Sequence, residues 1–95
     1  MENEKNTEAY LRGEVKRLGG RSYKWVSPGR VGVPDRIVIA PGGRVVFVET
    51  KSEGEKSNKQ QKRFQAELEA LGCTVYRDID TKEKVREMLR EVFAT

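Results

Sequence analysis

Apolar residues recur along the chain at two spacings, one typical of helices and the other of strands. Leu11, Val15 and Leu18 stand at i, i+4 and i+7, which predicts a helix that Thr7 caps and a pair of glycines ends. The polar residues 1–6 are expected to form a frayed tail. Two later segments show the same helical period, so the three predicted helices cover residues 7–18, 58–71 and 81–93.

Four short apolar groups predict strands. Two of them, residues 36–40 and 44–50, flank a Pro-Gly-Gly turn, which is typical of a β-hairpin. Neither run alternates cleanly between apolar and polar residues, so we expect helices to cover both faces of the hairpin. Shorter strands are expected at residues 23–26 and 73–77, the second parallel to the hairpin after a right-handed crossover. The resulting order, α-β-β-β-α-β-α, predicts an α/β domain with a small mixed β-sheet flanked by helices.

Composition restricts the chemistry of any site. The 95 residues suit one domain, and they include no histidine and a single cysteine, Cys73. These counts exclude Ser-His and Cys-His catalysis, an intrachain disulfide, and metal sites built from histidine or cysteine clusters. A bound metal would therefore be a hard cation held by oxygen atoms, such as Mg²⁺, Mn²⁺ or Ca²⁺.

Charge and hydropathy bear on the binding partners and the cellular location of the protein. The net charge of +4 and the sequence pI of about 9.4 favour polyanionic partners. There is no apolar run long enough to span a membrane, and Met1–Tyr10 shows no signal-peptide pattern. We expect a cytoplasmic protein of a bacterial or phage-infected cell, with no membrane partner and no organic cofactor.

Charged residues stand at the ends of the two most apolar strands. Asp35 precedes the first, whereas Glu49 and Lys51 close the second and share one face of it. Pairing across the two glycines of the turn sets Ala40 near Val45, and Asp35 near residue 50, to within about one residue. Two carboxylates, the backbone carbonyl of residue 50 and an ammonium group are therefore expected to meet at one end of the sheet.

This set of groups suits phosphodiester hydrolysis. Asp35, Glu49 and the Thr50 carbonyl supply three hard oxygen ligands for Mg²⁺ or Mn²⁺, and Lys51 can orient the attacking water. Each residue also has a structural interpretation, because Pro34-Asp35 is common in turns and a Glu-x-Lys pair can form an ion pair at a strand end. The coincidence of Pro-Asp, hairpin and Glu-x-Lys at this spacing favours the metal site.

The spacing of Pro34-Asp35 and the "ETK" at 49–51 resembles the PD-(D/E)xK nuclease superfamily. The longer stretches "KWVSPGRVGVPDRIVI", "PGGRVVFVETK" and "QQKRFQAELEALGCTVY" are similar to the VRR-NUC domain, over about residues 7–79. The resemblance implies that residues 1–95 form one nuclease domain with a restriction-endonuclease-like core. It also implies metal-dependent endonuclease activity on DNA, selective for branched or four-way (Holliday) junctions.

The resemblance also assigns residues to roles. Asp35 and Glu49 match the metal carboxylates and Lys51 the catalytic lysine. Glu8 matches the carboxylate of the first helix, a further metal ligand acting through water, with Glu14 as the alternative; a first-turn acid could equally serve only the helix dipole. Gln61 matches the catalytic glutamine and is preferred to the adjacent Gln60.

Contacts with the DNA backbone are expected from the loop "KWVSPGR" and from cations on either side of the site. The residues concerned are Lys24, Ser27, Arg30, Arg36, Lys56, Lys59, Lys62 and Arg63. Small domains of this family look like homodimers, which suits a branched substrate, and apolar residues of the last helix and of the Cys73 strand could form the interface. Two other functions stay open: a non-catalytic nucleic-acid-binding module and an RNA nuclease.

Overall fold

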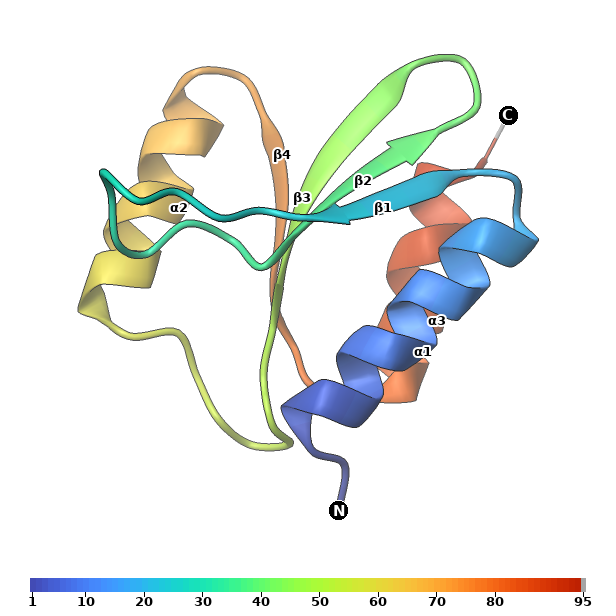
Figure 1. Cartoon of the computed structure of the whole chain (residues 1–95), viewed down its shortest axis with the longest axis horizontal. Helices are drawn as coiled ribbons and strands as arrows, with labels where there is room; N and C mark the ends of the chain where they lie inside the picture. Colours follow the sequence, from blue (N-terminus) through green and yellow to red (C-terminus); the bar gives the residue numbers. More distant parts are fainter. Residues whose placement is uncertain (95) are drawn as a thin grey trace.

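A four-stranded mixed sheet forms the centre of the molecule, with two helices on one face and one on the other (Figure 1). The computed structural model describes residues 1–94. The predicted order of elements and the fold class are confirmed. Across residues 1–94, every helix is too short or too polar to cross a bilayer. The elements are α1 (Glu4–Arg17), β1 (Arg21–Lys24), β2 (Arg36–Ala40), β3 (Arg44–Thr50), α2 (Lys59–Ala70), β4 (Thr74–Ile79) and α3 (Lys82–Val92).

The sheet has the strand order β1-β2-β3-β4, with antiparallel pairing except between β3 and β4, which are parallel as predicted. Ala40 pairs with Arg44, one residue from the expected Val45 and within the margin of about one residue. The turn has three residues because Gly42 and Gly43 both adopt positive φ, a conformation that favours glycine. Continuing this register beyond the pair of Arg36 with Val48 sets Asp35 opposite Glu49.

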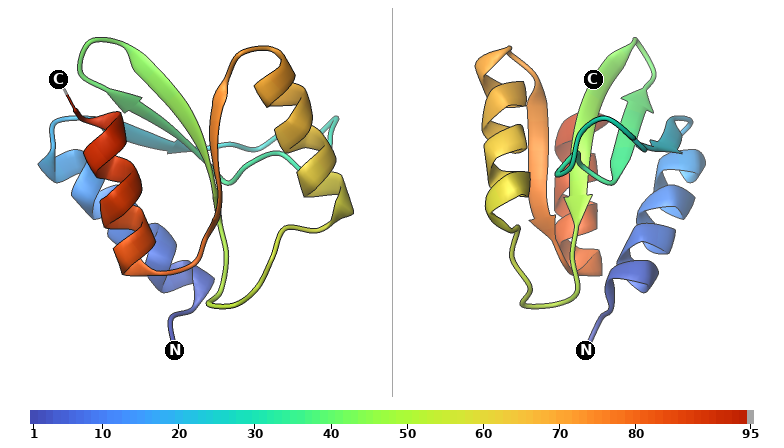
Figure 2. Two further views of the ribbon diagram at one scale, coloured as in Figure 1. Left: turned by 180° about the vertical axis from the view of Figure 1, so that it is seen from behind. Right: turned by 60° about the vertical axis from the view of Figure 1, so that its left-hand side comes forward.

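The main core lies between the sheet and the helix pair α1 and α3 (Figure 2). Alternate residues of β2 and β3 point into it, as do the apolar stripes of both helices. The buried side chains include Leu11, Val15, Val38, Ala40, Val46, Val48, Val85, Met88, Leu89 and Val92. The apolar residues of α3 are buried in this core. The expectation that the last helix offers an apolar surface to a partner is therefore wrong.

Helix α2 covers the opposite face of the sheet only in part. Phe47 of β3 packs against Trp25, with ring centroids 5.2 Å apart, and Trp25 packs against Phe64 of α2 at 5.5 Å. Farther from α2, Tyr23 is 54% exposed and Val45 is 45% exposed. The expectation that both faces of the hairpin are covered therefore holds near Phe47 and fails at Val45, next to the turn, because one short helix cannot cover the whole face of the sheet.

The N-terminal residues are ordered by contacts that local periodicity does not reveal. Asn3, and not Thr7, caps α1: its Oδ1 accepts a hydrogen bond from the Asn6 N–H at 2.8 Å. The Glu2 N–H donates to Glu53 Oε1 at 2.9 Å, and the Glu53 N–H donates to the Glu2 carbonyl at 3.0 Å. The expected frayed tail at 1–6 is thus wrong, since the helix begins at Glu4 and the residues before it pair with the loop after β3.

The loop before β2 docks onto the start of α2 through a glycine. Gly32 has φ +89°, and a Cβ at this position would lie 2.7 Å from the Gln60 carbonyl oxygen. Pro34, two residues later, is fully buried. This close approach fixes the segment that delivers Asp35 to the sheet end.

We expect Gly32→Ala to lower the free energy of unfolding by about 2–4 kcal/mol, because it adds backbone strain and a clash with the α2 backbone. Gly54→Ala is the matched control, since Gly54 has φ +86° and open space where a Cβ would sit. It should cost about 1–2 kcal/mol, for the backbone conformation alone. Urea denaturation of both variants measures the difference, and equal losses would show that the docking contact is not tight.

Candidate functional site

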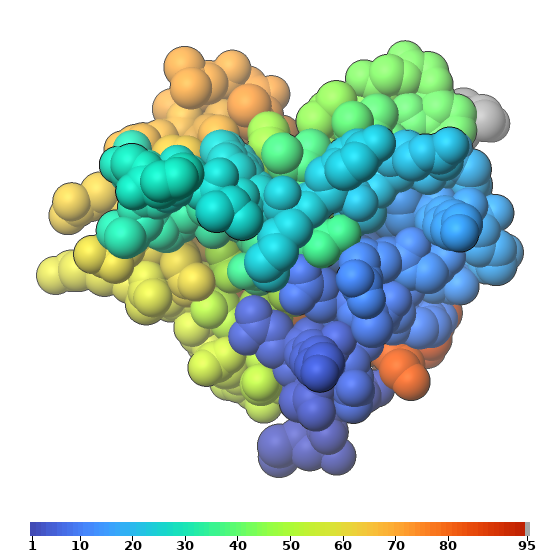
Figure 3. Space-filling model, viewed as in Figure 1, coloured from blue at the N-terminus to red at the C-terminus, as the bar shows by residue number. Residues whose placement is uncertain are grey.

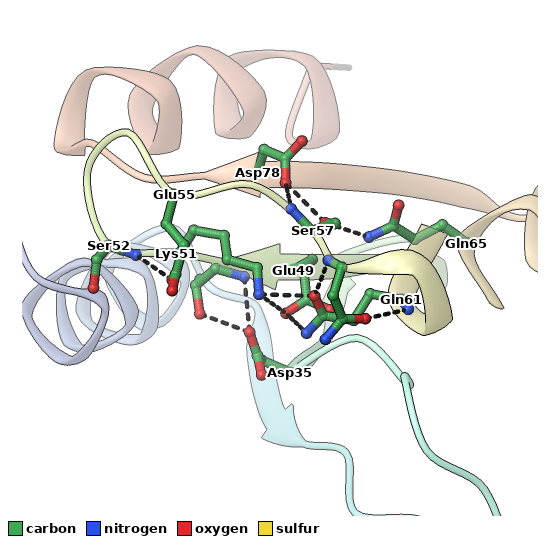
Figure 4. Close-up of polar contacts among 11 residues, drawn as sticks. Asp35, Glu49, Lys51, Ser52, Glu55, Ser57, Gln61, Gln65 and Asp78 are labelled. Carbon is green, nitrogen blue, oxygen red and sulfur yellow. Dashed lines mark hydrogen bonds and ion pairs between the residues drawn. The ribbon is translucent and has the colours of Figure 1, made fainter. Parts of the chain in front are cut away.

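Asp35 is held across the hairpin by Thr50. Its Oδ2 accepts hydrogen bonds from the Thr50 N–H and from the Thr50 hydroxyl, both at 2.9 Å (Figure 4). Thr50 is fully buried, and Asp35 itself is partly buried. These two bonds orient the Asp35 carboxylate toward the end of β3, where Glu49 lies.

Glu49 is a buried carboxyl group with an unusual set of neighbours. Its side chain is 1% exposed, and its Oε1 is buried without a hydrogen-bond partner. Burial, together with the closeness and negative charge of Asp35, raises the pKa of Glu49 to about 9, against the opposing effect of Lys51. Glu49 and Asp35 thus form a close pair of carboxyl groups with too little positive charge nearby.

Lys51 and Gln61 complete this cluster. The Lys51 Nζ donates to Gln61 Oε1 at 2.8 Å and lies 3.8 Å from Glu49 Oε2, while the Gln61 Nε2 donates to the same Glu49 oxygen at 3.3 Å. Gln61 Oε1 also accepts from the Asn58 N–H at 2.8 Å, and Asn58 Oδ1 accepts from the Gln61 N–H at 2.9 Å. This reciprocal capping box ties the first turn of α2 directly to Lys51 and Glu49.

The acid of α1 that lies nearest this cluster is Glu4. Its backbone N–H donates to Ser52 Oγ at 3.2 Å. Partial burial raises the pKa of Glu4, the charge of Asp35 raises it further, and Lys51 lowers it. Because α1 begins one turn earlier than expected, its first turn, which carries Glu4, lies level with the site.

Glu8 and Glu14 are engaged elsewhere. Glu8 Oε2 accepts from the Arg36 Nη1 at 3.2 Å and lies 3.6 Å from the Lys24 Nζ, whereas Glu14 pairs with Arg17 at 3.0 Å. The structure therefore does not bring Glu8 or Glu14 into the cluster around Glu49. The Asn3 cap, immediately before Glu4, was the sequence signal that could have identified the helix start.

The expected DNA-contacting cations differ in availability. Arg36 is 6% exposed, and its guanidinium donates to Ser22 as well as to Glu8, so the expectation that it contacts DNA is contradicted by its burial. Arg30 pairs with Glu67 at 2.9 Å and lies 4.5 Å above the Phe64 ring. Ser27 is partly buried, while Lys24, Lys56, Lys59, Lys62 and Arg63 are exposed.

Asp78 anchors the loop between Lys51 and α2, and sequence analysis gave no indication of it. Its Oδ1 accepts from both the N–H and the hydroxyl of Ser57 at 2.8 Å, and the Gln65 Nε2 donates to the same hydroxyl at 2.9 Å. Asp78 has φ +55° and lies at the register shift between β3 and β4, just before Ile79 pairs with Thr50. The loop that joins the two halves of the site is therefore fastened to β4.

The oxygen groups of the site fit a hard divalent cation. Within residues 1–94, no three carboxylate, histidine or cysteine side chains converge closely enough to hold an ion by themselves. The Asp35 and Glu49 pair would have to be supplemented by a backbone carbonyl, water and phosphate oxygens, which is how Mg²⁺ is commonly bound. The unpartnered Glu49 Oε1 is a buried oxygen that a cation would satisfy.

Comparisons with known proteins find a similar sequence and a similar structure. No family model matches the chain. A protein of Acyrthosiphon pisum secondary endosymbiont phage 1, named "Putative nuclease p44", is 52% identical over 72 residues, which are 76% of this chain and 77% of that protein. A solved structure described as "VRR_NUC domain" shares 28% identity and has a TM-score of 0.88, covering 98% of this chain and 100% of that one.

The raised pKa of Glu49 predicts a pH-dependent stability in the absence of metal. Because the folded-state pKa of about 9 lies above the ordinary 4.5, the folded protein retains a proton that the unfolded chain releases. The stabilisation is therefore present at low pH and is lost as the pH rises toward 9. We expect a loss on the order of a few kcal/mol for this group, at about 1.4 kcal/mol per pKa unit.

Urea denaturation in EDTA at a series of pH values measures this loss. Glu49→Gln imitates the protonated form and should remove most of the decline, so that the variant becomes more stable than wild type at high pH. Parallel pH profiles for the two proteins would contradict the raised pKa.

Proposed function

The chain belongs to the VRR-NUC domain family, and on that premise we propose that it is a divalent-metal-dependent endonuclease of the PD-(D/E)xK type, which hydrolyses phosphodiester bonds of branched or four-way (Holliday) junction DNA. The nuclease-like fold and the name of the phage relative support nuclease chemistry in general. The metal dependence and the choice of substrate are inferred from the chain's own residues.

One observation carries the metal dependence: Glu49 places a buried, unpartnered carboxyl oxygen beside Asp35. A buried carboxylate pair is costly unless positive charge compensates it, and Lys51 is the only cation that contacts either carboxyl group within residues 1–94. The pair would hold Mg²⁺ or Mn²⁺, with the Thr50 carbonyl as a third oxygen and Glu4 reaching the ion through water. When bound, the cation would polarise the phosphate and lower the pKa of a coordinated water.

In this proposal Lys51 acts on the substrate. Its ammonium group has three N–H donors, and the structure uses one on Gln61 Oε1 and directs another toward Glu49 Oε2. The remaining donor can hold the attacking water or neutralise charge on the phosphate oxygens as water adds to phosphorus. Gln61 keeps the Lys51 side chain in this position, since it binds both Lys51 and Glu49.

The preference for branched DNA and the homodimer are further parts of the proposal. Two sites in a fixed relation would suit a four-way junction, and the exposed Tyr23 and Val45 form the apolar face that a second copy could cover. We also propose that the protein acts in the cytoplasm of a bacterial or phage-infected cell. A sizing column run beside the activity assay tests the oligomeric state.

Lys51→Ala should lower kcat by about 10²–10⁴-fold, because the donor that faces the reacting phosphate is removed. The measurement is initial cleavage rates of four-way, flap, splayed and linear DNA in MgCl₂ and MnCl₂, with RNA strands of the same sequence alongside. Lys82→Ala, on α3, is the control and should cleave at the wild-type rate. Undiminished cleavage by Lys51→Ala would overturn the assigned chemistry, and equal rates on all DNA forms would overturn the substrate preference.

Glu4→Gln should weaken Mn²⁺ binding by about 10-fold or more. An acid that contacts the ion through water affects metal affinity about as much as other residues that hold the metal indirectly. Glu8→Gln should leave the Mn²⁺ affinity unchanged and lower stability by about 1–3 kcal/mol, because the buried Arg36 loses a charged partner. Isothermal titration calorimetry gives the affinities and urea denaturation the stabilities. The reverse pattern of affinities would return the metal role to Glu8.

A further inference from the structure

A basic groove runs between α1 and the edge strand β1, apart from the catalytic cluster. Two neighbouring hollows of about 280 and 200 Å³ share Arg12 in their linings. Lys16 and Arg21 line the first, and Lys5 and Lys24 line the second. We call these two hollows together the α1–β1 groove.

The charges in the α1–β1 groove are nearly all positive and exposed. Lys5, Arg12 and Lys16 stand at i, i+7 and i+11 and form one stripe along α1. Arg21 and Lys24 face them from β1. The one acid that lines the groove, Glu8, pairs with the buried Arg36, whose charge balances it, so the five exposed cations leave the groove strongly positive.

The residues that line the hollows between these cations have small side chains. Ala9, Gly20 and Ser22 line the two hollows, and no large apolar side chain does. Such a surface suits a regularly charged polyanion and offers no apolar anchor to a protein partner. The stripe spans about 16 Å at 1.5 Å per helical residue, or about five phosphates of one strand at 3.4 Å each.

The groove and the cations of α2 lie on different sides of the site. Figure 1 places α1 and α2 at opposite sides of the lower end of β3, and Figure 3 shows α1 and β1 together on the face turned toward the viewer. Lys56, Lys59 and Lys62 are exposed at and before the start of α2. Because a short duplex resists bending, two arms that diverge from a branch could cover surfaces on the two sides of the site without a bending energy.

We propose that the α1–β1 groove binds the sugar-phosphate backbone of a second DNA duplex arm, while the cations near α2 bind the arm on the other side of the scissile phosphate. The inference rests on the proposed nuclease function and extends it to the source of branch selectivity within a single chain. Contacts of this kind are independent of sequence and depend strongly on salt.

The test compares two triple variants with the same change of charge. Arg12→Gln/Lys16→Gln/Arg21→Gln neutralises the groove, and the control Lys82→Gln/Arg86→Gln/Arg90→Gln neutralises exposed cations of α3. Fluorescence anisotropy in EDTA, over a range of salt, measures binding to a forked DNA and to a linear duplex of equal total length. Circular dichroism and urea denaturation check that all proteins are folded.

We expect the groove variant to bind the fork at least 10-fold more weakly at low salt, with the slope of log K against log salt reduced by about 2–3, or about 0.9 per lost phosphate contact. Binding to the linear duplex should change by less than about 3-fold, and the α3 control should match wild type on both probes.

Unchanged fork binding by the groove variant, or an equal loss on fork and linear DNA, would overturn the second-arm assignment even if the enzyme cleaves junctions normally. The predicted binding pattern without any metal-dependent cleavage by wild type would instead overturn the nuclease proposal and support the groove as a nucleic-acid surface. Because binding is measured in EDTA, the two failures are distinguishable.

Discussion

The molecule is organised around two carboxyl groups that are forced together inside it. Hairpin register sets Asp35 opposite Glu49, and Thr50 fixes the first of these by two hydrogen bonds. Burial then leaves Glu49 with a strongly raised pKa and one oxygen without a partner. Keeping these two carboxyl groups together is energetically unfavourable, so contacts from several elements must fix their positions. Most of the contacts described above that lie outside the main core have this effect.

Three separate attachments hold the elements around that pair. Gly32 lets the preceding loop press against the α2 backbone, and the residues before α1 pair with the loop after β3. Asp78 fastens the segment after Lys51 to β4 through Ser57. The main core between the sheet and the α1–α3 pair supplies the rigidity on which these attachments depend, because it is built from fully buried aliphatic residues.

Sequence analysis predicted best what is decided locally. The hairpin and its charged ends lie within 17 consecutive residues, Asp35 to Lys51, so an error of one residue in register still brought the carboxyl groups together. Glu4 and Glu8 lie one helical turn apart, and only the Asn3 cap and a distant loop decide which of them reaches the site. Burial of Arg36 and the anchoring by Asp78 depend on tertiary partners, which a single sequence does not display.

The capping box of α2 has a consequence for dynamics. One amide, that of Gln61, closes the helix terminus on Asn58 and at the same time bonds to Lys51 and Glu49. Helix ends are where local opening costs least, so a brief unwinding of this turn would release the lysine from its position. Under the proposed function, the position of the Lys51 ammonium group would therefore depend on the integrity of this single turn of helix.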